Sequence, residues 1–207
     1  AQLLEKRGIK VGNMQKTVKS TAELEVELNA NYAFDAITEA GEDLQIVSGP
    51  GYQGLQNLGN SCYMNSIFQF FFSIPELATR YGFNNSVTEH PFVRAVAPTV
   101  APTDVLCQTS KLACALTSGE YAKPPDVFAD SNNPKYRLAP RMMKHCIGKD
   151  HVDFRTHQQQ DAAQFLQYFL ERLDRAELGA TSTMVKERLS KYTASHLFSF
   201  QTTSRLV

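Results

Sequence analysis

The sequence predicts an α+β fold in which helices predominate. One observation is the long amphipathic pattern over residues 157–178, where apolar side chains recur with the spacing of a single helical face. A second is the continuous apolar run over residues 67–72, which is typical of a helix that is buried nearly all round. The third is the tail over residues 196–207, where alternating and β-branched residues predict a strand.

Residues 1–50 are predicted to form a lead-in or linker, followed by one folded region over residues 51–207. Within the lead-in, the apolar spacing of residues 17–31 fits a short helix or a strand, and the pattern leaves both open. The cluster Ser-Gly-Pro-Gly at residues 48–51 is a strong breaker and separates the two regions. A loop rich in glycine and asparagine is predicted next, over residues 52–60.

A buried helix is predicted to begin near Cys62, with Ser61 as its N-cap, and to end just before Pro75. Gly179 is a natural C-cap for the long helix, and Pro140 suits the first turn of a short one. Shorter helices are predicted over residues 103–117, 139–147 and 183–191, and loops over residues 82–102, 119–136 and 148–156.

The charge balance and the cysteines restrict the class of protein. Lysine plus arginine number 21 and aspartate plus glutamate number 21, so the net charge is zero and nothing predicts nucleic-acid binding. The four cysteines show neither a C-x-x-C motif nor the paired spacing of a zinc site. The sequence shows no secretory signal and no apolar run that would span a membrane. We therefore expect a cytoplasmic or nuclear protein with reduced thiols.

Cys62 is placed where a thiol can become reactive. In the first turn of a buried helix it meets the positive end of the helix dipole and unpaired N–H groups, and both favour the thiolate. Asn57 can direct its amide at a developing oxyanion, and the N–H of Cys62 supplies a second donor. Gly54 and Gly59 let the backbone pass close to a bound peptide. On these principles alone an inert core cysteine is the commoner outcome, so the spacing does not decide between the two.

Two segments resemble the ubiquitin-specific protease family. Residues 54–66, Gly-Leu-Gln-Asn-Leu-Gly-Asn-Ser-Cys-Tyr-Met-Asn-Ser, are similar to the cysteine box of that family, and residues 159–165, Gln-Gln-Asp-Ala-Ala-Gln-Phe, to its second box. Segments such as LTSGEYAKP and APRMMKHCIGK look closest to the isopeptidase T subfamily. The resemblance implies a papain-like fold. The chain would form mainly the helical thumb half of a thumb–palm–fingers catalytic domain and end at the start of the β fingers.

The resemblance also implies roles for five residues. Cys62 would be the nucleophile, and Asn57 would be the oxyanion-hole side chain. Asp161 would contact the extended C-terminal tail of ubiquitin, which ends Leu-Arg-Gly-Gly, and Gln160 would line the same cleft. Gln164 stands where the family carries Glu, so it would contact the tail arginine without charge assistance, at a loss of about 1–2 kcal/mol of affinity.

A cysteine protease of this kind needs a histidine as base, and the family carries it C-terminal to the second box with an Asp or Asn that orients it. We expect the sequence to be truncated before that His box, so the chain alone is predicted to be inactive. No cofactor or metal is expected in this segment, and zinc would belong to parts of the protein outside it. None of the histidines present is assigned as catalytic, namely His90, His145, His151, His157 and His196.

Three functions are open from the sequence. The resemblance favours a deubiquitinating thiol hydrolase that cleaves peptide and isopeptide bonds after the C-terminal glycine of ubiquitin and disassembles free polyubiquitin chains. The alternative is a catalytically incomplete relative that binds ubiquitin as an interaction module. The third is a helical packing domain without a link to ubiquitin. The partners expected for the first two are ubiquitin and polyubiquitin chains, with no nucleic acid and no membrane.

Overall fold

The computed structural model describes residues 38–39, 42–43, 49–82, 87–122, 138–189 and 191–203. The chain divides into two compact units, Ala1–Gln45 and Ile46–Val207. In the first unit, β1 (Thr38–Glu39) pairs with β2 (Glu42–Asp43) in an antiparallel ladder. The helix or strand predicted over residues 17–31 lies outside the described residues.

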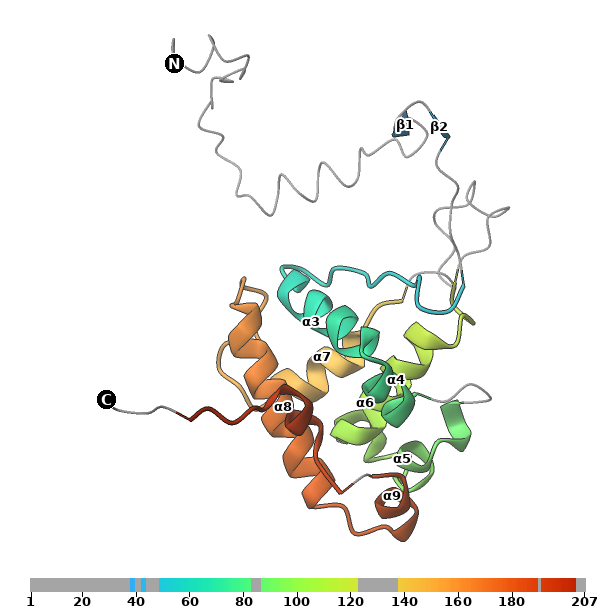
Figure 1. Cartoon of the computed structure of the whole chain (residues 1–207), viewed down its shortest axis with the longest axis vertical. Helices are drawn as coiled ribbons and strands as arrows, with labels where there is room; N and C mark the ends of the chain where they lie inside the picture. The colour runs from blue at the N-terminus through green and yellow to red at the C-terminus, as the bar shows by residue number, and fades with distance from the viewer. Residues whose placement is uncertain are drawn as a thin grey trace. The chain divides into compact units, whose positions relative to one another are not determined.

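Apart from an isolated parallel bridge between Leu55 and Leu138, the regular elements described in the second unit are all helices, joined by loops (Figure 1). Its α-helices are α3 (Cys62–Ser73), α4 (Pro75–Tyr81), α5 (Pro91–Arg94), α6 (Val105–Thr117), α7 (Arg141–Gly148), α8 (Ala162–Leu178) and α9 (Thr183–Arg188). Short 3-10 turns are η2 (Val87–Glu89), η3 (Ala101–Thr103) and η6 (Ala194–Phe198). No helix in these described stretches has both the length and the apolar character needed to cross a bilayer.

The helices α3, α6, α7, α8 and α9 confirm the predicted helical segments to within a few residues at each end. Their ends follow ordinary capping chemistry. The Asp104 carboxylate accepts the N–H of Cys107 at the start of α6, and the Asp161 carboxylate accepts the N–H of Gln164 at the start of α8. Gly179 is the C-cap of α8, as predicted. Pro140 is the N-cap residue of α7 and lies just before its first turn.

Two predictions about local structure are confirmed with a difference, and a third was wrong. Ser61 is the N-cap residue of α3, but its side chain makes no capping hydrogen bond. Pro75 follows the end of α3 as predicted, but it is also the first residue of α4, where proline's missing N–H costs nothing. The loop predicted over residues 82–102 contains η2, α5 and the first residues of η3.

The tail predicted as a strand begins instead with η6 and shows no strand in its described part, residues 196–203. The residues just before this tail are held by α8, whose carboxylates accept their backbone N–H groups at the start of the 3-10 turn. Glu177 accepts the N–H of Ala194 at 3.2 Å, and Asp174 accepts the N–H of Ser195 at 3.3 Å. Ala194 is also fully buried, so the chain is held against α8 as a tight turn.

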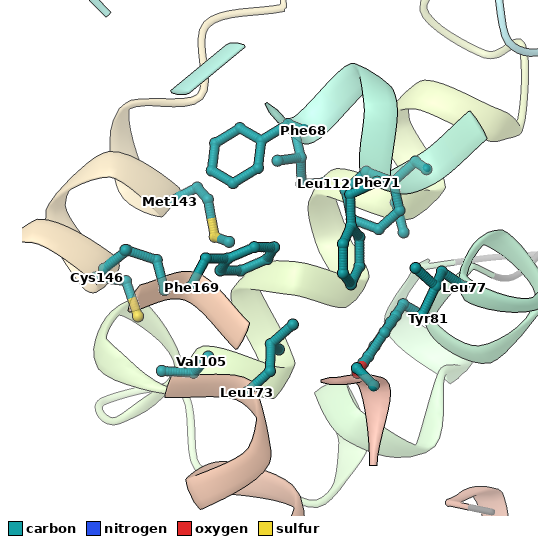
Figure 2. Packing of buried hydrophobic residues seen from close by; sticks show 14 of the residues in the cluster. Phe68, Phe71, Leu77, Tyr81, Val105, Leu112, Met143, Cys146, Phe169 and Leu173 are labelled. Atoms are coloured by element: carbon teal, nitrogen blue, oxygen red, sulfur yellow. The ribbon is translucent and has the colours of Figure 1, made fainter. Parts of the chain in front are cut away.

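Aromatic rings from α3 and α8 form the centre of the core. Phe68 of α3 lies edge-on to Phe165 and Phe169 of α8, with ring centroids 5.7 and 5.5 Å apart. Phe71, one turn further along α3, lies 5.1 Å from Phe169. Figure 2 shows Phe68, Phe71 and Phe169 together, with side chains of other helices around them. This packing fixes where the N-termini of α3 and α8 lie relative to each other, and both carry predicted site residues.

Candidate active site

Cys62 is the first residue of α3 and is exposed, whereas Cys107, Cys114 and Cys146 are buried. Burial raises the pKa of the Cys146 thiol to about 11 and also raises that of Cys107. A buried thiol with a raised pKa is neither accessible nor readily ionised, so it is chemically inert. Of the four cysteines in the sequence, Cys62 alone can reach a macromolecular substrate.

The N-terminus of α3 is left without a side-chain cap because Ser61 is engaged elsewhere. The Ser61 hydroxyl donates to the side-chain oxygen of Asn57 at 3.1 Å and accepts the backbone N–H of Leu58 at 2.8 Å. The first N–H groups of a helix carry partial positive charge and have no partner inside the helix. At Cys62 they therefore remain available to a thiolate or to an oxyanion.

Asn57 is oriented by the loop that it closes. Its side-chain oxygen accepts three hydrogen bonds, from the N–H of Gly59 at 3.1 Å, the N–H of Ser61 at 3.0 Å and the Ser61 hydroxyl. Since two of these donors are backbone amides, the acceptor must be the oxygen, which settles which end of the amide faces the loop. The NH₂ group is consequently the end that is left to donate outward, as an oxyanion hole requires.

The backbone between Asn57 and Cys62 has a conformation that few residues adopt. Gly59 has φ +88° and the next residue, Asn60, has φ +50°. Glycine is unrestricted there, and asparagine tolerates the left-handed region better than most residues do. The two positive φ angles turn the chain so that Asn57 faces back toward the start of α3.

The stretch before Asn57 is fastened to α3 by amide side chains. Asn65 donates to the carbonyl of Gln56 at 3.2 Å, and Gln69 donates to the carbonyl of Gln53 at 2.8 Å. On its other side the N–H of Gln56 donates to the carbonyl of Leu138 at 2.9 Å. The loop that carries Asn57 is therefore held to the helix that carries Cys62 along several residues.

The second box lies next to the cysteine box. The Asn60 side chain donates to the carbonyl of His157 at 2.9 Å, and a Cβ built on Gly59 would lie 3.4 Å from the His157 ring. The bond joins residues 97 positions apart in sequence, so it holds the residues just before the second box against the cysteine box.

The predicted tail-binding residues lie at and just before the start of α8. Asp161 is exposed and is the N-cap residue of that helix, with one carboxylate oxygen 2.8 Å from the N–H of Gln164. Gln164 is exposed on the first turn, and Gln160 is half-buried with its amide 3.5 Å from the carbonyl of Asp153. Capping alone accounts for an aspartate at this position, but it leaves the second carboxylate oxygen of Asp161 available.

The histidines are held by other groups. His151 stacks on Phe154 with ring centroids 4.1 Å apart, and its Nδ1 accepts the N–H of Phe154. His90 is fully buried and caps α5, and burial lowers its pKa to about 4. His196 stacks on Tyr192 at 4.2 Å. Within the described part of the chain no contact joins a histidine ring to Cys62, and no three metal-binding side chains gather as a metal site.

Reasoning from the sequence missed four residues that build the site. Ser61 was taken for a helix cap, whereas it fixes Asn57. Asn60, Asn65 and Gln69 were given no role, although each ties the loop to a neighbouring element. The available signal was the density of amide side chains around Cys62, since half-buried amides in a loop need partners.

Comparison with known proteins places the site in context. The family described as "Ubiquitin carboxyl-terminal hydrolase" matches residues 53–207. A protein from Homo sapiens named ubiquitin carboxyl-terminal hydrolase 5 is 39% identical over 182 residues, covering 84% of this chain and 21% of that protein. Ubiquitin carboxyl-terminal hydrolase A from Dictyostelium discoideum is 41% identical over 177 residues, covering 82% and 20%. Ubiquitin carboxyl-terminal hydrolase 14 from Schizosaccharomyces pombe is 39% identical over 185 residues, covering 84% and 22%. The chain therefore spans about a fifth of the length of these curated relatives.

Proposed function

Because the chain belongs to the ubiquitin carboxyl-terminal hydrolase family, we propose that the whole protein is a deubiquitinating thiol hydrolase that cleaves peptide and isopeptide bonds after the C-terminal glycine of ubiquitin. One observation carries the proposal. Cys62 is the exposed cysteine among four, and it opens a helix whose N-terminus is left uncapped beside an oriented Asn57. A buried structural thiol would show none of these features.

The chemistry follows from this arrangement. The Cys62 thiolate attacks the carbonyl carbon of the terminal glycine, and the carbonyl oxygen becomes an oxyanion that accepts from the Asn57 NH₂ group and the Cys62 N–H. Collapse of the intermediate breaks the C–N bond, and the departing amine takes a proton while ubiquitin stays on sulfur as a thioester. Water then hydrolyses the thioester and frees the thiol. The proton transfers belong to a histidine of the family's His box, outside the five histidines of this sequence.

The tail of ubiquitin is assigned to the start of α8. The second oxygen of Asp161 is available to the arginine in Leu-Arg-Gly-Gly, because only the first is used by the helix N–H. Gln164 and Gln160 would add uncharged hydrogen bonds along the same tail. The contact between Asn60 and His157 supports this assignment, since it holds the residues just before the second box against the loop of Asn57.

By the same proposal the preferred substrates are free polyubiquitin chains, as the isopeptidase T resemblance implies, and the protein works in the cytoplasm or the nucleus. No cofactor takes part in the step at Cys62. Any zinc belongs to parts of the protein other than this segment.

A ubiquitin-binding module that has lost catalysis is the second candidate. One observation favours it: Gln164 stands where the family carries Glu. The two candidates differ only in whether Cys62 is activated.

The test is a reaction between the longest available form of the protein and ubiquitin that carries a thiol-reactive electrophile at its C-terminus. We expect a covalent adduct that is absent in Cys62→Ala and retained in Cys107→Ala. Failure of the folded protein to form an adduct, together with retained binding of ubiquitin, would favour the binding module instead.

A further inference from the structure

A pocket of about 460 Å³ is lined in part by Asn57, the proposed oxyanion donor, and by Leu58 beside it. Its charged lining comes mainly from α7 and the residue that follows it, with Arg141, Lys144 and Lys149, and from Arg155 on the loop before α8. Two histidines, His145 and His157, also line the pocket. The pocket thus gathers cations from two segments around one concave space.

These cations have no partners within the chain's described part. No carboxylate lines the pocket. None of the side chains of Arg141, Lys144, Lys149 and Arg155 makes an ion pair or hydrogen bond to a described residue. Burial lowers the pKa of Lys144, as expected for a cation without a compensating anion. The whole sequence has zero net charge, so the cluster does not simply reflect a basic protein.

The pocket is held in shape by its walls. A Cβ on Gly148, at the end of α7, would lie 2.7 Å from the carbonyl oxygen of Phe154, so the backbones of the two segments touch there. The Tyr168 hydroxyl donates to the carbonyl of Ile147 at 3.0 Å and ties α7 to α8. The third wall is fixed by the bond from Asn60 to the carbonyl of His157. Like charges are therefore kept close by packing rather than by an anion.

We propose that this pocket binds a small molecule carrying several phosphate-type anionic groups, a site that lies beyond the hydrolase function proposed above. Two guanidinium groups offer paired N–H donors that match phosphate oxygens, and two ammonium groups add point charge. The volume is that of a small-molecule site, not of a flat protein interface. The cations also exclude the basic tail of ubiquitin from this pocket. None of Gln160, Asp161 and Gln164, the residues assigned to that tail, lines it.

The proposal is tested by calorimetric titration of the full 207-residue chain at about 0.15 M salt, a screening length of about 8 Å. The probes are inositol hexakisphosphate, inorganic pyrophosphate and a doubly phosphorylated peptide. We expect one-to-one binding of the compact polyanions, weakened at least about tenfold in Lys149→Gln/Arg155→Gln. The peptide should bind more weakly than inositol hexakisphosphate.

The matched control removes the same two charge types elsewhere, as Arg94→Gln/Lys186→Gln on the exposed surfaces of α5 and α9. It should bind like the unaltered chain, and the thermal midpoints of both variants should show that they fold. Equal weakening in both variants would mean diffuse attraction and would overturn the proposal, as would the absence of binding by every probe. Tighter binding of the peptide would overturn the assignment to a small molecule. None of these readouts depends on Cys62 chemistry.

Discussion

At the scale of single residues, the contact between Ser61 and Asn57 decides how the candidate oxyanion hole is built. The hydroxyl is fully buried and serves two partners at once, Asn57 and the N–H of Leu58. Asn57 retains its two backbone donors without it, so Ser61 is a positioning residue and not a catalytic one.

Replacing Ser61 with alanine is expected to lower kcat for ubiquitin cleavage about fivefold, with KM changed less than about twofold, since one hydrogen bond of about 1 kcal/mol is lost from the orientation of Asn57. The measurement is steady-state cleavage of a fluorogenic ubiquitin amide by the longest available form. Ser61→Thr keeps the hydroxyl and should restore most of the rate. Ser73→Ala, at the exposed end of α3, serves as control. A rate for Ser61→Ala equal to that of the unaltered protein would remove Ser61 from this role.

His90 links the stability of the fold to pH. Its pKa in the folded chain is about 4, against about 6.5 when unfolded, so the unfolded state binds more protons between these values. The stabilisation by neutral His90 is complete above about pH 6.5 and is lost as the pH falls toward 4, by up to about 3 kcal/mol.

A substitution that removes the titration of His90 should make the free energy of unfolding depend less on pH. His90→Asn keeps an N-cap for α5 but cannot be protonated, so its free energy of unfolding should fall less between pH 6.5 and pH 4 than that of the unaltered chain. Urea unfolding at a series of pH values measures this. The exposed His145→Asn is the comparison and should leave the slope unchanged. Parallel curves for His90→Asn and the unaltered chain would contradict the expectation.

At the scale of elements, periodicity explains which helices the sequence reveals. α8 and α6 are long enough for an apolar face to repeat, and each begins at an aspartate cap. α4 and α5 are short and begin with proline, so they look like breaks in a loop. The tail carries a strand pattern, yet Glu177 and Asp174 bind the backbone of the two residues just before it, and no local pattern can reveal partners on another helix.

In the candidate site, too, the sequence predicts some features and cannot reveal others. The positions of Cys62 and Asn57 were predictable because each follows from its place next to a helix start. The role of Ser61 was not, because a serine before a helix usually caps it and only the folded loop shows it turned toward Asn57. The contact of Asn60 with His157 depends on how α3 and α8 pack, which spacing does not specify.

The close approach of α7 to the loop before α8 gives a test at this scale. Gly148→Ala would place a Cβ 2.7 Å from the backbone oxygen of Phe154, so one segment must move, at an expected loss of about 1–3 kcal/mol in the free energy of unfolding. Gly54→Ala meets open space and should change the same quantity by less than about 0.5 kcal/mol. Denaturant unfolding compares them, and similar midpoints would show that the contact is not tight.

At the scale of the whole molecule, the described helical unit holds the proposed nucleophile, oxyanion donor and tail-binding residues, and none of its histidines is assigned as the base. A cysteine hydrolase without a base leaves its thiol mostly protonated and its leaving group unassisted. His151 stacks on Phe154, His196 stacks on Tyr192, and His90 caps α5. The described unit therefore holds all the residues proposed to bind the ubiquitin tail, whereas the proposed catalytic residues in it are limited to Cys62 and Asn57.

We accordingly expect the 207-residue chain to release no fluorophore from a ubiquitin amide above the background of Cys62→Ala. The longest available form, assayed beside it, should turn over. The measurement is continuous fluorescence at matched protein concentrations, with circular dichroism to confirm that both chains are folded. Turnover by the short chain that vanishes in Cys62→Ala would mean that one of its own histidines acts as the base.

At the uncapped start of α3, the stability of the helix and the reactivity of Cys62 favour different side chains at position 61. An aspartate at position 61 would place a capping carboxylate on the helix N–H groups, worth about 1 kcal/mol in a typical helix. It would also set a permanent negative charge beside Cys62 and fill the donors that an anionic intermediate needs. Because Ser61 is fully buried and its hydroxyl donates to the Asn57 oxygen, the acceptor-only carboxylate would also lose that bond, so Ser61→Asp should gain little thermal stability and should lose ubiquitin cleavage.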